Sequence, residues 1–167
     1  MRSHKYEKHL TLPPRITRER AVALLHDHAN VINLSPIATN HHKLEATSTA
    51  GIDTDTNEPR TSYEVTDAVS YLPFGLWDGS LTVAVVFTDH VDGVSAVKHA
   101  PLGMTIKERW TVRDTAAGPG EETTDGEVLL QVELVASQPV VWLTAGMMEK
   151  NHNVYIEKLG KLLKTAE

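Results

Sequence analysis

The sequence predicts an α+β domain in which one long C-terminal helix packs on a curved antiparallel sheet. Three features carry this prediction. From Pro139 to Lys164, apolar residues recur at the helical period, with charged residues on the opposite face. Tyr63 to Tyr71 and Met104 to Arg113 alternate between two faces as half-buried strands do, and Asp92-Gly93 is typical of a tight turn between strands. Because almost everything before the long helix reads as strand, we expect a sheet to bury its apolar stripe.

The N-terminal part of the chain predicts a strand followed by a broken helix. Lys5 to Leu12 is expected to form the first strand, and Pro13-Pro14 ends it because proline lacks a hydrogen-bond donor and restricts the backbone. Thr17 then has the side chain of a good N-cap. The helix expected from Arg18 towards Asn33 should break near His28 into two short helices.

The remaining strands follow from alternation and from turn residues. They are expected at Ile37–Glu45, Tyr63–Tyr71, Leu81–Thr88, Val94–Ala100, Met104–Arg113 and Glu127–Ala136. Counting the first strand, this makes about seven strands. Leu72 to Gly79 joins two of them through an apolar stretch rich in turn residues, so its large side chains either plug the core or line an opening.

The apolar stripe of the long helix carries two polar-tipped side chains. Its members are Val141, Ala145, Met148, His152, Tyr155, Leu159 and Leu162. His152 and Tyr155 lie about one turn apart, where a core helix normally has only hydrocarbon. Imidazole donates and accepts hydrogen bonds near neutral pH, so the pair is a candidate to bind or protonate a ligand oxygen. The alternative is a core histidine with satisfied hydrogen bonds and a tyrosine whose hydroxyl reaches the backbone.

Two carboxylates fall on the inner faces of predicted strands. Glu108 lies on the face of Ile106 and Trp110, where burial would raise its pKa and make the acid form available near neutral pH. Its alternatives are a pair with a buried arginine or histidine, or a place at the wet end of the strand. Asp67 has the same status on its own strand, with a β-bulge or a bond to a turn as the alternative. Facing one cavity, the two carboxylates would share a proton or act as acid and base.

Composition argues for one domain covering residues 1–167, because 167 residues with 41% hydrophobic content build a single core. The net charge of −6 offers no basic surface for nucleic acid or an anionic membrane. Cysteine is absent, which excludes disulfides and a thiolate nucleophile. The N-terminal residues lack the apolar run of a signal peptide, and no later stretch is long enough to span a bilayer. We therefore expect a soluble, cytoplasmic protein.

Motifs for metals and cofactors are missing from the sequence. Nine histidines are present, yet His26 and His28 fall on nearly opposite sides of a helix, and His41 and His42 on opposite faces of a strand. The sequence contains no HExxH motif, phosphate loop, Rossmann fingerprint or nucleophile elbow. We expect neither a metal nor a cofactor.

Several motifs place the chain among known folds. They are Leu12-Pro13 with Ile16-Thr17, Leu24-Leu25-His26-Asp27-His28, Asn33-Leu34-Ser35-Pro36, Leu72-Pro73 with Gly75-Leu76-Trp77-Asp78-Gly79, Asp92-Gly93-Val94 and His99-Ala100-Pro101-Leu102-Gly103. Over nearly the whole chain they resemble a family of uncharacterised small fungal proteins. The order of elements resembles the helix-grip fold of the START-like superfamily, which includes pathogenesis-related allergens, lipid-transfer domains and aromatic polyketide cyclases. The resemblance implies a cavity for a small apolar molecule under the C-terminal helix.

Large side chains are available to line such a cavity. Besides the four polar candidates, the expected lining residues are Tyr63, Tyr71, Phe74, Trp77, Ile106, Trp110 and Met148. Trp142 is a further large apolar surface, and tryptophans of small domains most often lie in the core.

Three functions remain open on this basis. The first is a cofactor-free enzyme in which Glu108, Asp67, His152 or Tyr155 polarises a terpenoid or polyketide intermediate of a fungal natural-product pathway. Isomerisation, cyclisation or pericyclic ring closure fits such a site, because these reactions need shape and at most one proton donor. The second is a carrier for a hydrophobic, lipid-like ligand. The third is a dimerising scaffold without a cavity, and a homodimer is compatible with each of the three.

Overall fold

The computed structural model describes residues 1–45, 59–70, 78–114 and 126–166. In chain order the elements are β1 (Arg2–Thr11), α1 (Arg18–His26), α2 (His28–Leu34), β2 (Ala38–Lys43), β3 (Arg60–Ser70), β4 (Asp78–His90), β5 (Gly93–Ala100), β6 (Met104–Asp114), β7 (Gly126–Ala136) and α3 (Gln138–Thr165). Every element expected from the sequence is present. The predicted boundaries differ from these by a few residues at most.

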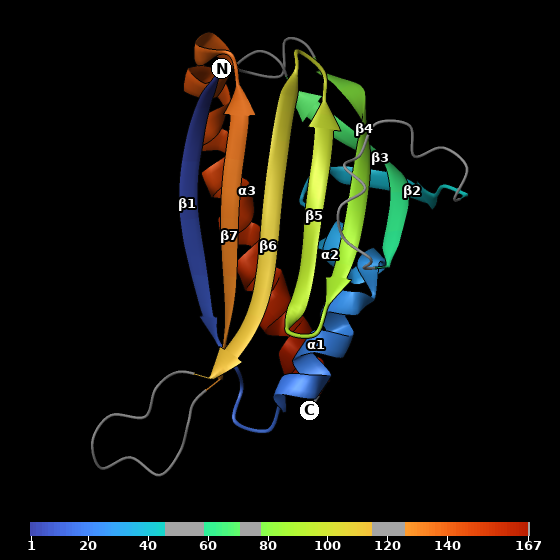
Figure 1. The fold of residues 1–167 in the computed structure, drawn as a ribbon, viewed down its shortest axis with the longest axis vertical. Helices are drawn as coiled ribbons and strands as arrows, with labels where there is room; N and C mark the ends of the chain where they lie inside the picture. The colour runs from blue at the N-terminus through green and yellow to red at the C-terminus, as the bar shows by residue number, and fades with distance from the viewer. Residues whose placement is uncertain (46–58, 71–77, 115–125, 167) are drawn as a thin grey trace.

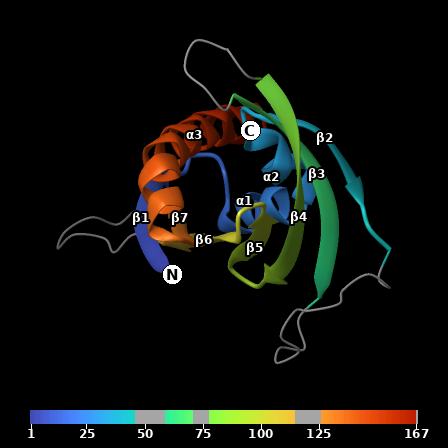
Figure 2. The ribbon, with the colours of Figure 1, turned by 90° about the horizontal axis from the view of Figure 1, so that it is seen from above.

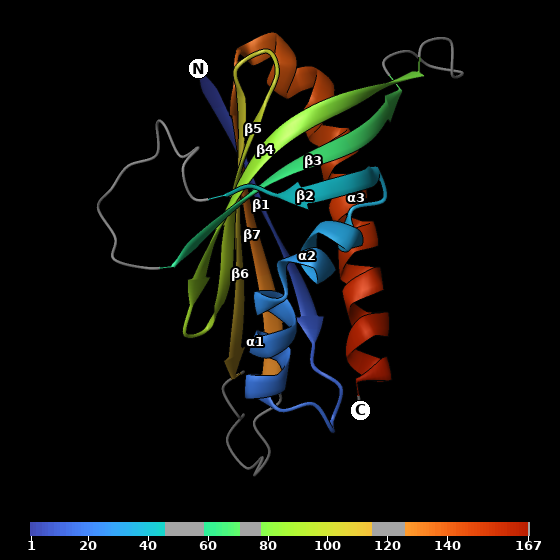
Figure 3. The same ribbon diagram turned by 90° about the vertical axis from the view of Figure 1, so that its right-hand side faces the viewer.

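The strands form one curved antiparallel sheet. Its seven strands are ordered β1-β7-β6-β5-β4-β3-β2, so the first strand of the chain pairs with the last. Figure 1 shows α3 running behind β1, β7 and β6, and Figure 2 shows the sheet curving around the helices. In Figure 3, α1 and α2 lie between the sheet and α3. The predicted helix-grip fold is confirmed.

The broken helix near the N-terminus forms as its sequence indicates. The side-chain oxygen of Thr17 accepts the backbone N–H of Arg20 at 3.2 Å, which satisfies a donor of the first turn. Asp27 has φ of −77° and ψ of 90°, outside the helical region, and separates α1 from α2. The break predicted near His28 is therefore confirmed.

The β4–β5 turn depends on glycine at position 93. A Cβ atom on Gly93 would lie 2.0 Å from the backbone oxygen of Trp110 on the neighbouring strand β6. No side chain fits at that distance. Glycine at position 93 therefore allows the start of β5, directly after the tight turn predicted at Asp92-Gly93, to lie against β6.

One face of α3 is buried from Met148 to Leu163, whereas Val141 and Ala145 at the start of the predicted stripe are only partly buried. The buried side chains are Met148, His152, Tyr155, Leu159 and Leu163. Leu162, expected on the stripe, is only partly buried, while Leu163 is fully buried. Both residues lie about one turn after Leu159, so periodicity alone does not choose between them. The crossing of α3 over the sheet turns Leu163 inward. In the described part of the chain, no helix is both long and apolar enough to span a membrane.

The two tryptophans that the structure describes differ in position. Trp110 is fully buried in the core, whereas Trp142 is 84% exposed. The expectation that Trp142 supplies core surface is wrong, because the first turns of α3 lie at the upper edge of the sheet beside the start of β1, beyond the main packing surface (Figure 1). Trp77 lies outside the described residues.

Candidate functional site

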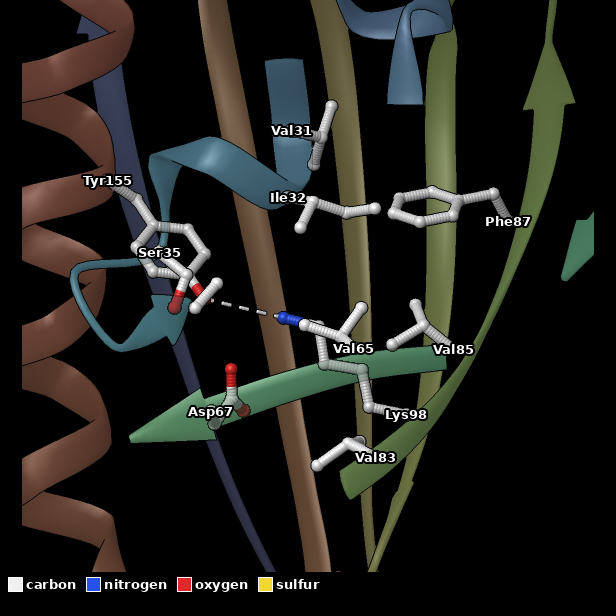
Figure 4. A pocket seen from close by; sticks show the side chains of 11 residues that line it. Val31, Ile32, Ser35, Val65, Asp67, Val83, Val85, Phe87, Lys98 and Tyr155 are labelled. Carbon is white, nitrogen blue, oxygen red and sulfur yellow. Dashed lines mark hydrogen bonds between the residues drawn. The ribbon is translucent and has the colours of Figure 1, made fainter. Parts of the chain in front are cut away.

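A small cavity lies between the sheet, α2 and α3. Its lining residues are Val31, Ile32, Ser35, Ala38, Val65, Asp67, Val83, Val85, Phe87, Lys98 and Tyr155, most of which Figure 4 shows around the central space. The volume is about 30 Å³, above the roughly 10–15 Å³ that one water molecule requires. The walls are mainly aliphatic, and the polar exceptions are Ser35, Asp67, Lys98 and Tyr155.

Lys98 brings a cation into this apolar space. It continues the inward face of β5 after Val94 and Ala96, both fully buried, and its own side chain is 18% exposed. In Figure 4 its amino group points towards Tyr155 of α3, and the Lys98 Nζ to Tyr155 hydroxyl distance is 3.5 Å. The same Nζ lies 5.4 Å from the centroid of the Tyr155 ring, within range of a cation–π contact.

Glu108 is buried and forms an ion pair inside the core. Its side chain is 1% exposed, and its Oε1 accepts hydrogen bonds from Lys98 Nζ and from His152 Nε2, the latter at 3.1 Å. Burial by itself raises the pKa of Glu108, but the Lys98 charge and the two hydrogen bonds outweigh it and lower the pKa to about 2. The prediction of a raised pKa is wrong, because a lysine lies within bonding distance. Of the alternatives, the pairing with a buried histidine is the one observed.

His152 connects Glu108 to Tyr6 of β1. The Tyr6 hydroxyl lies 2.6 Å from His152 Nδ1, which is also 2.9 Å from the backbone oxygen of Met148. Carboxylate oxygens only accept, so Nε2–H donates to Glu108. The tautomer sets the roles at Nδ1: a bare Nδ1 accepts the Tyr6 proton, whereas an Nδ1–H donates to the Tyr6 hydroxyl or to the Met148 oxygen. Burial and the nearby Glu108 raise the pKa of Tyr6. We call Tyr6, His152, Glu108, Lys98 and Tyr155 the buried polar chain.

Asp67 faces the cavity from β3. Figure 4 shows its carboxylate pointing into the space that Lys98 and Tyr155 also face. Burial raises the pKa of Asp67, Lys98 opposes this shift and Glu108 adds to it. Within the described residues no hydrogen bond joins Asp67 to Glu108, and their pKa values move in opposite directions. The sharing of one proton, predicted as one possibility, is therefore wrong, because Lys98 holds Glu108 ionised.

Two polar atoms, one within the buried polar chain and one beside it, lack a partner among the described residues. They are Glu108 Oε2 and Trp110 Nε1, both buried. One only accepts and the other only donates, and their residues share the inner face of β6. The Trp110 ring stacks on the Tyr155 ring at a centroid distance of 6.4 Å. An uncompensated buried polar atom costs about 1–3 kcal/mol, so this part of the core has unused capacity to bind a water or a ligand oxygen.

The predicted lining residues are distributed differently. Tyr71, Phe74 and Trp77 lie outside the described residues. Ile106, Trp110 and Met148 are buried in the core but do not line the cavity. Tyr63 contacts Phe87, a wall of the cavity, edge to face at 5.7 Å. A role in substrate binding stays a prediction for all seven residues.

Sequence reasoning did not select Lys98, Tyr6 or Ser35. A signal for Lys98 is present in the sequence, since alternation along β5 places it on the inner face with Val94 and Ala96. Tyr6 likewise alternates with exposed residues along β1. Ser35 carries no such signal, because its place beside Tyr155 depends on how α2 meets α3.

The histidines near the helix break have structural partners. His28 Nε2 lies 2.8 Å from a carboxylate oxygen of Asp89, and His26 Nε2 lies 2.9 Å from the backbone oxygens of both His90 and Gly93. These bonds attach α1 and α2 to the β4–β5 hairpin. Among the described residues, no group of three or more His, Cys, Asp or Glu side chains is arranged to hold a metal ion.

Comparison with known proteins places the fold. A family model described as "Domain of unknown function (DUF7053)" matches residues 1–165. Among solved structures, the Zhui aromatase/cyclase from Streptomyces sp. R1128 has a TM-score of 0.63 at 11% identity, over 98% of this chain and 94% of that one. TTHA0849 from Thermus thermophilus has a TM-score of 0.57 at 12% identity, over 99% of both chains.

A third solved structure, Ara h 8.0201, has a TM-score of 0.55 at 13% identity, over 98% of this chain and 99% of that one. At these identities the likeness shows the fold alone. No curated protein sequence matches the chain.

Proposed function

We propose that this chain, which belongs to the DUF7053 family, binds a small apolar molecule between the sheet, α2 and α3 and isomerises or cyclises it without a cofactor. The observation that carries the proposal is the cavity itself. Three functional groups, on Asp67, Lys98 and Tyr155, converge on a space whose other walls are mainly aliphatic. Apolar walls with a few convergent polar groups are the usual composition of a small-molecule site.

The cavity wall indicates the kind of ligand. Valine and isoleucine side chains suit a hydrocarbon body, and Lys98 with Tyr155 suits one oxygen on it. A terpenoid or polyketide intermediate of a fungal natural-product pathway has this composition. The fold shared with an aromatase/cyclase supports the reaction class by analogy alone.

Binding such a ligand requires the cavity to widen. Its volume of about 30 Å³ is far below the roughly 300–1,000 Å³ of drug-sized ligand sites. The ligand must therefore displace wall side chains such as Val65 and Val83. We expect an induced expansion between β3, β4 and α2, and a preference for compact ligands.

A second function, binding without conversion, is favoured by the state of Glu108. A carboxylate with a pKa of about 2 stays ionised at neutral pH, and both Lys98 and His152 occupy its Oε1. Such a group orients its neighbours and does not exchange protons during turnover. The carrier hypothesis needs nothing more, whereas the enzyme hypothesis assigns proton transfer to Asp67.

One experiment separates the two functions. The purified protein is incubated with a metabolite extract from a producing organism that lacks this gene, and the mixture is followed by liquid chromatography and mass spectrometry. A compound replaced by a new peak of the same mass supports an isomerase or cyclase. A compound that is retained on the protein but unchanged supports the carrier. Retention of none contradicts both.

A further inference from the structure

We infer that the substrate is an apolar ketone with a removable proton beside its carbonyl group, that Lys98 and Tyr155 bind the carbonyl oxygen, and that Asp67 removes the proton. This inference rests on the proposed function and names its substrate class. It goes further because it assigns a chemical task to three of the four polar residues of the cavity wall, Asp67, Lys98 and Tyr155.

The hydrogen-bond capacity of Lys98 supports the first task. An ammonium group has three N–H donors. One is used by Glu108 and a second is directed at the Tyr155 hydroxyl over 3.5 Å. The third has no acceptor among the described residues, and the amino group borders the cavity. A ligand oxygen placed there receives a charge-assisted hydrogen bond beside mainly aliphatic walls, where such bonds are stronger than in water.

Glu108 keeps this donor in its charged form. Its negative charge and hydrogen bond raise the pKa of Lys98, against the opposing effect of burial. Lys98 is therefore a fixed cation and a poor amine nucleophile. This favours stabilisation of a developing oxyanion over formation of a Schiff base.

Asp67 is placed and tuned as a base. It faces the same space from β3, on the strand next to β4, whose Val83 and Val85 form the apolar wall. Burial raises its pKa, which makes its ionised form a stronger base than an exposed aspartate. In the part of the chain that the structure describes, no side chain donates a hydrogen bond to its carboxylate, so its oxygens are available to a ligand.

The reaction that these groups support is the shift of a double bond. Asp67 takes a proton from the carbon between the carbonyl group and an isolated double bond. The electron pair of that C–H bond forms a new carbon–carbon double bond, and the carbonyl electron pair moves onto the oxygen, beside Lys98 and Tyr155. The protonated Asp67 then returns the proton to the far carbon of the former double bond. The product is the conjugated ketone, with the same atoms and no change in oxidation state.

The full-length chain tests this inference with a compact probe, cyclohex-3-en-1-one, whose product cyclohex-2-en-1-one is conjugated and absorbs in the ultraviolet. Binding is measured separately by nuclear magnetic resonance with cyclohexanone, which has no double bond to shift. We expect conversion by the wild-type protein. We expect Asp67→Asn to lower the catalysed rate constant by about 100-fold or more, because positioned proton transfer contributes that much, while cyclohexanone binding is retained. Glu157→Gln, on the exposed face of α3, is the matched control and should change neither quantity.

Lys98 requires a paired variant, since its removal alone leaves Glu108 as an unpaired buried charge. Lys98→Met combined with Glu108→Gln removes both charges, and circular dichroism checks its fold. We expect this variant to lose both conversion and preferential binding of cyclohexanone over cyclohexane.

The outcomes distinguish a failure of the assigned reaction from a failure of the proposed function. Cyclohexanone binding without conversion, or full conversion by Asp67→Asn, overturns the assigned reaction and leaves ligand binding intact. Absence of cyclohexanone binding to the wild-type protein overturns the proposed function as well.

Discussion

At the scale of single residues, the pair of Lys98 and Glu108 determines the character of the site. Glu108 is nearly inaccessible, whereas Lys98 retains some exposure at the cavity. Two charges in a core are tolerated only when each compensates the other, and His152 supplies a further bond to the carboxylate. The pair therefore places one positive and one negative charge among the polar side chains beside the cavity.

We predict that breaking this pair on one side destabilises the protein strongly. Lys98→Met leaves the Glu108 charge buried without a cation, and we expect a loss of about 3 kcal/mol in the free energy of unfolding. Adding Glu108→Gln should restore most of that loss, because the unpaired charge is then gone. Urea denaturation of the two variants and the wild-type protein measures both effects. A single variant as stable as the double variant would contradict the ion pair.

The same pair makes stability depend on acid pH. Folding lowers the Glu108 pKa from 4.5 to about 2, so its contribution is present above about pH 4.5 and is lost as the pH falls towards 2. We expect the free energy of unfolding of the wild-type protein to decrease across this window more steeply than that of Glu108→Gln. Denaturant titrations at several pH values test this. Parallel curves would show that Lys98 does not hold Glu108 ionised.

At the scale of elements, the contact of α3 with the sheet depends on which residues face inward. Leu163 is fully buried at the C-terminal end of α3, and its neighbour Leu162 is only partly buried. The buried face continues from Tyr155 through Leu159. Leu163, and not Leu162, therefore makes the main core contact at the end of α3.

Matched leucine substitutions measure this orientation. We predict that Leu163→Ala costs about 2–5 kcal/mol of unfolding free energy, as expected for a large-to-small change in a packed core. Leu162→Ala should cost distinctly less, because part of its side chain is already in water. Thermal or urea denaturation of both variants gives the comparison. Equal losses, or a larger loss for Leu162→Ala, would contradict the inward orientation of Leu163 and support the predicted stripe with Leu162.

At the scale of the whole molecule, a narrow cavity lies where the curved sheet, α2 and α3 meet. A ligand that binds only the folded chain stabilises it by about 2.7 kcal/mol when its free concentration is 100 times its Kd. Ligand binding at this cavity is therefore visible as a rise in the unfolding temperature of the intact protein.

We predict that a side chain that fills the cavity weakens ligand binding without lowering the stability of the ligand-free protein. Val83→Ile adds one methylene group to the wall of a space of about 30 Å³, so it should leave the ligand-free protein as stable or slightly more stable. The rise in unfolding temperature caused by a ligand from the extract experiment should become smaller. Leu129→Ile, a change of shape at a buried position that does not line the cavity, is the control. An undiminished rise in Val83→Ile would locate the ligand elsewhere.

Much of the fold follows from local patterns in the sequence. Alternation placed the strands, as at Met104 to Arg113, and periodicity placed the long helix. Thr17 and Gly93 act through contacts with nearby backbone or through a tight turn, so their roles could be predicted from local chemistry. The burial of Glu108 was predictable as well, because the period of a strand decides which face a side chain takes.

The sequence by itself therefore determined the elements, their order and the inward position of Glu108 and His152. The tertiary structure decided what these groups meet: Lys98 beside Glu108, Tyr6 beside His152, and Asp67 facing the cavity. The physical reason is that a pKa and a cavity wall depend on atoms brought together from distant parts of the chain. Periodicity tells which way a side chain points, whereas only packing tells which charge lies there.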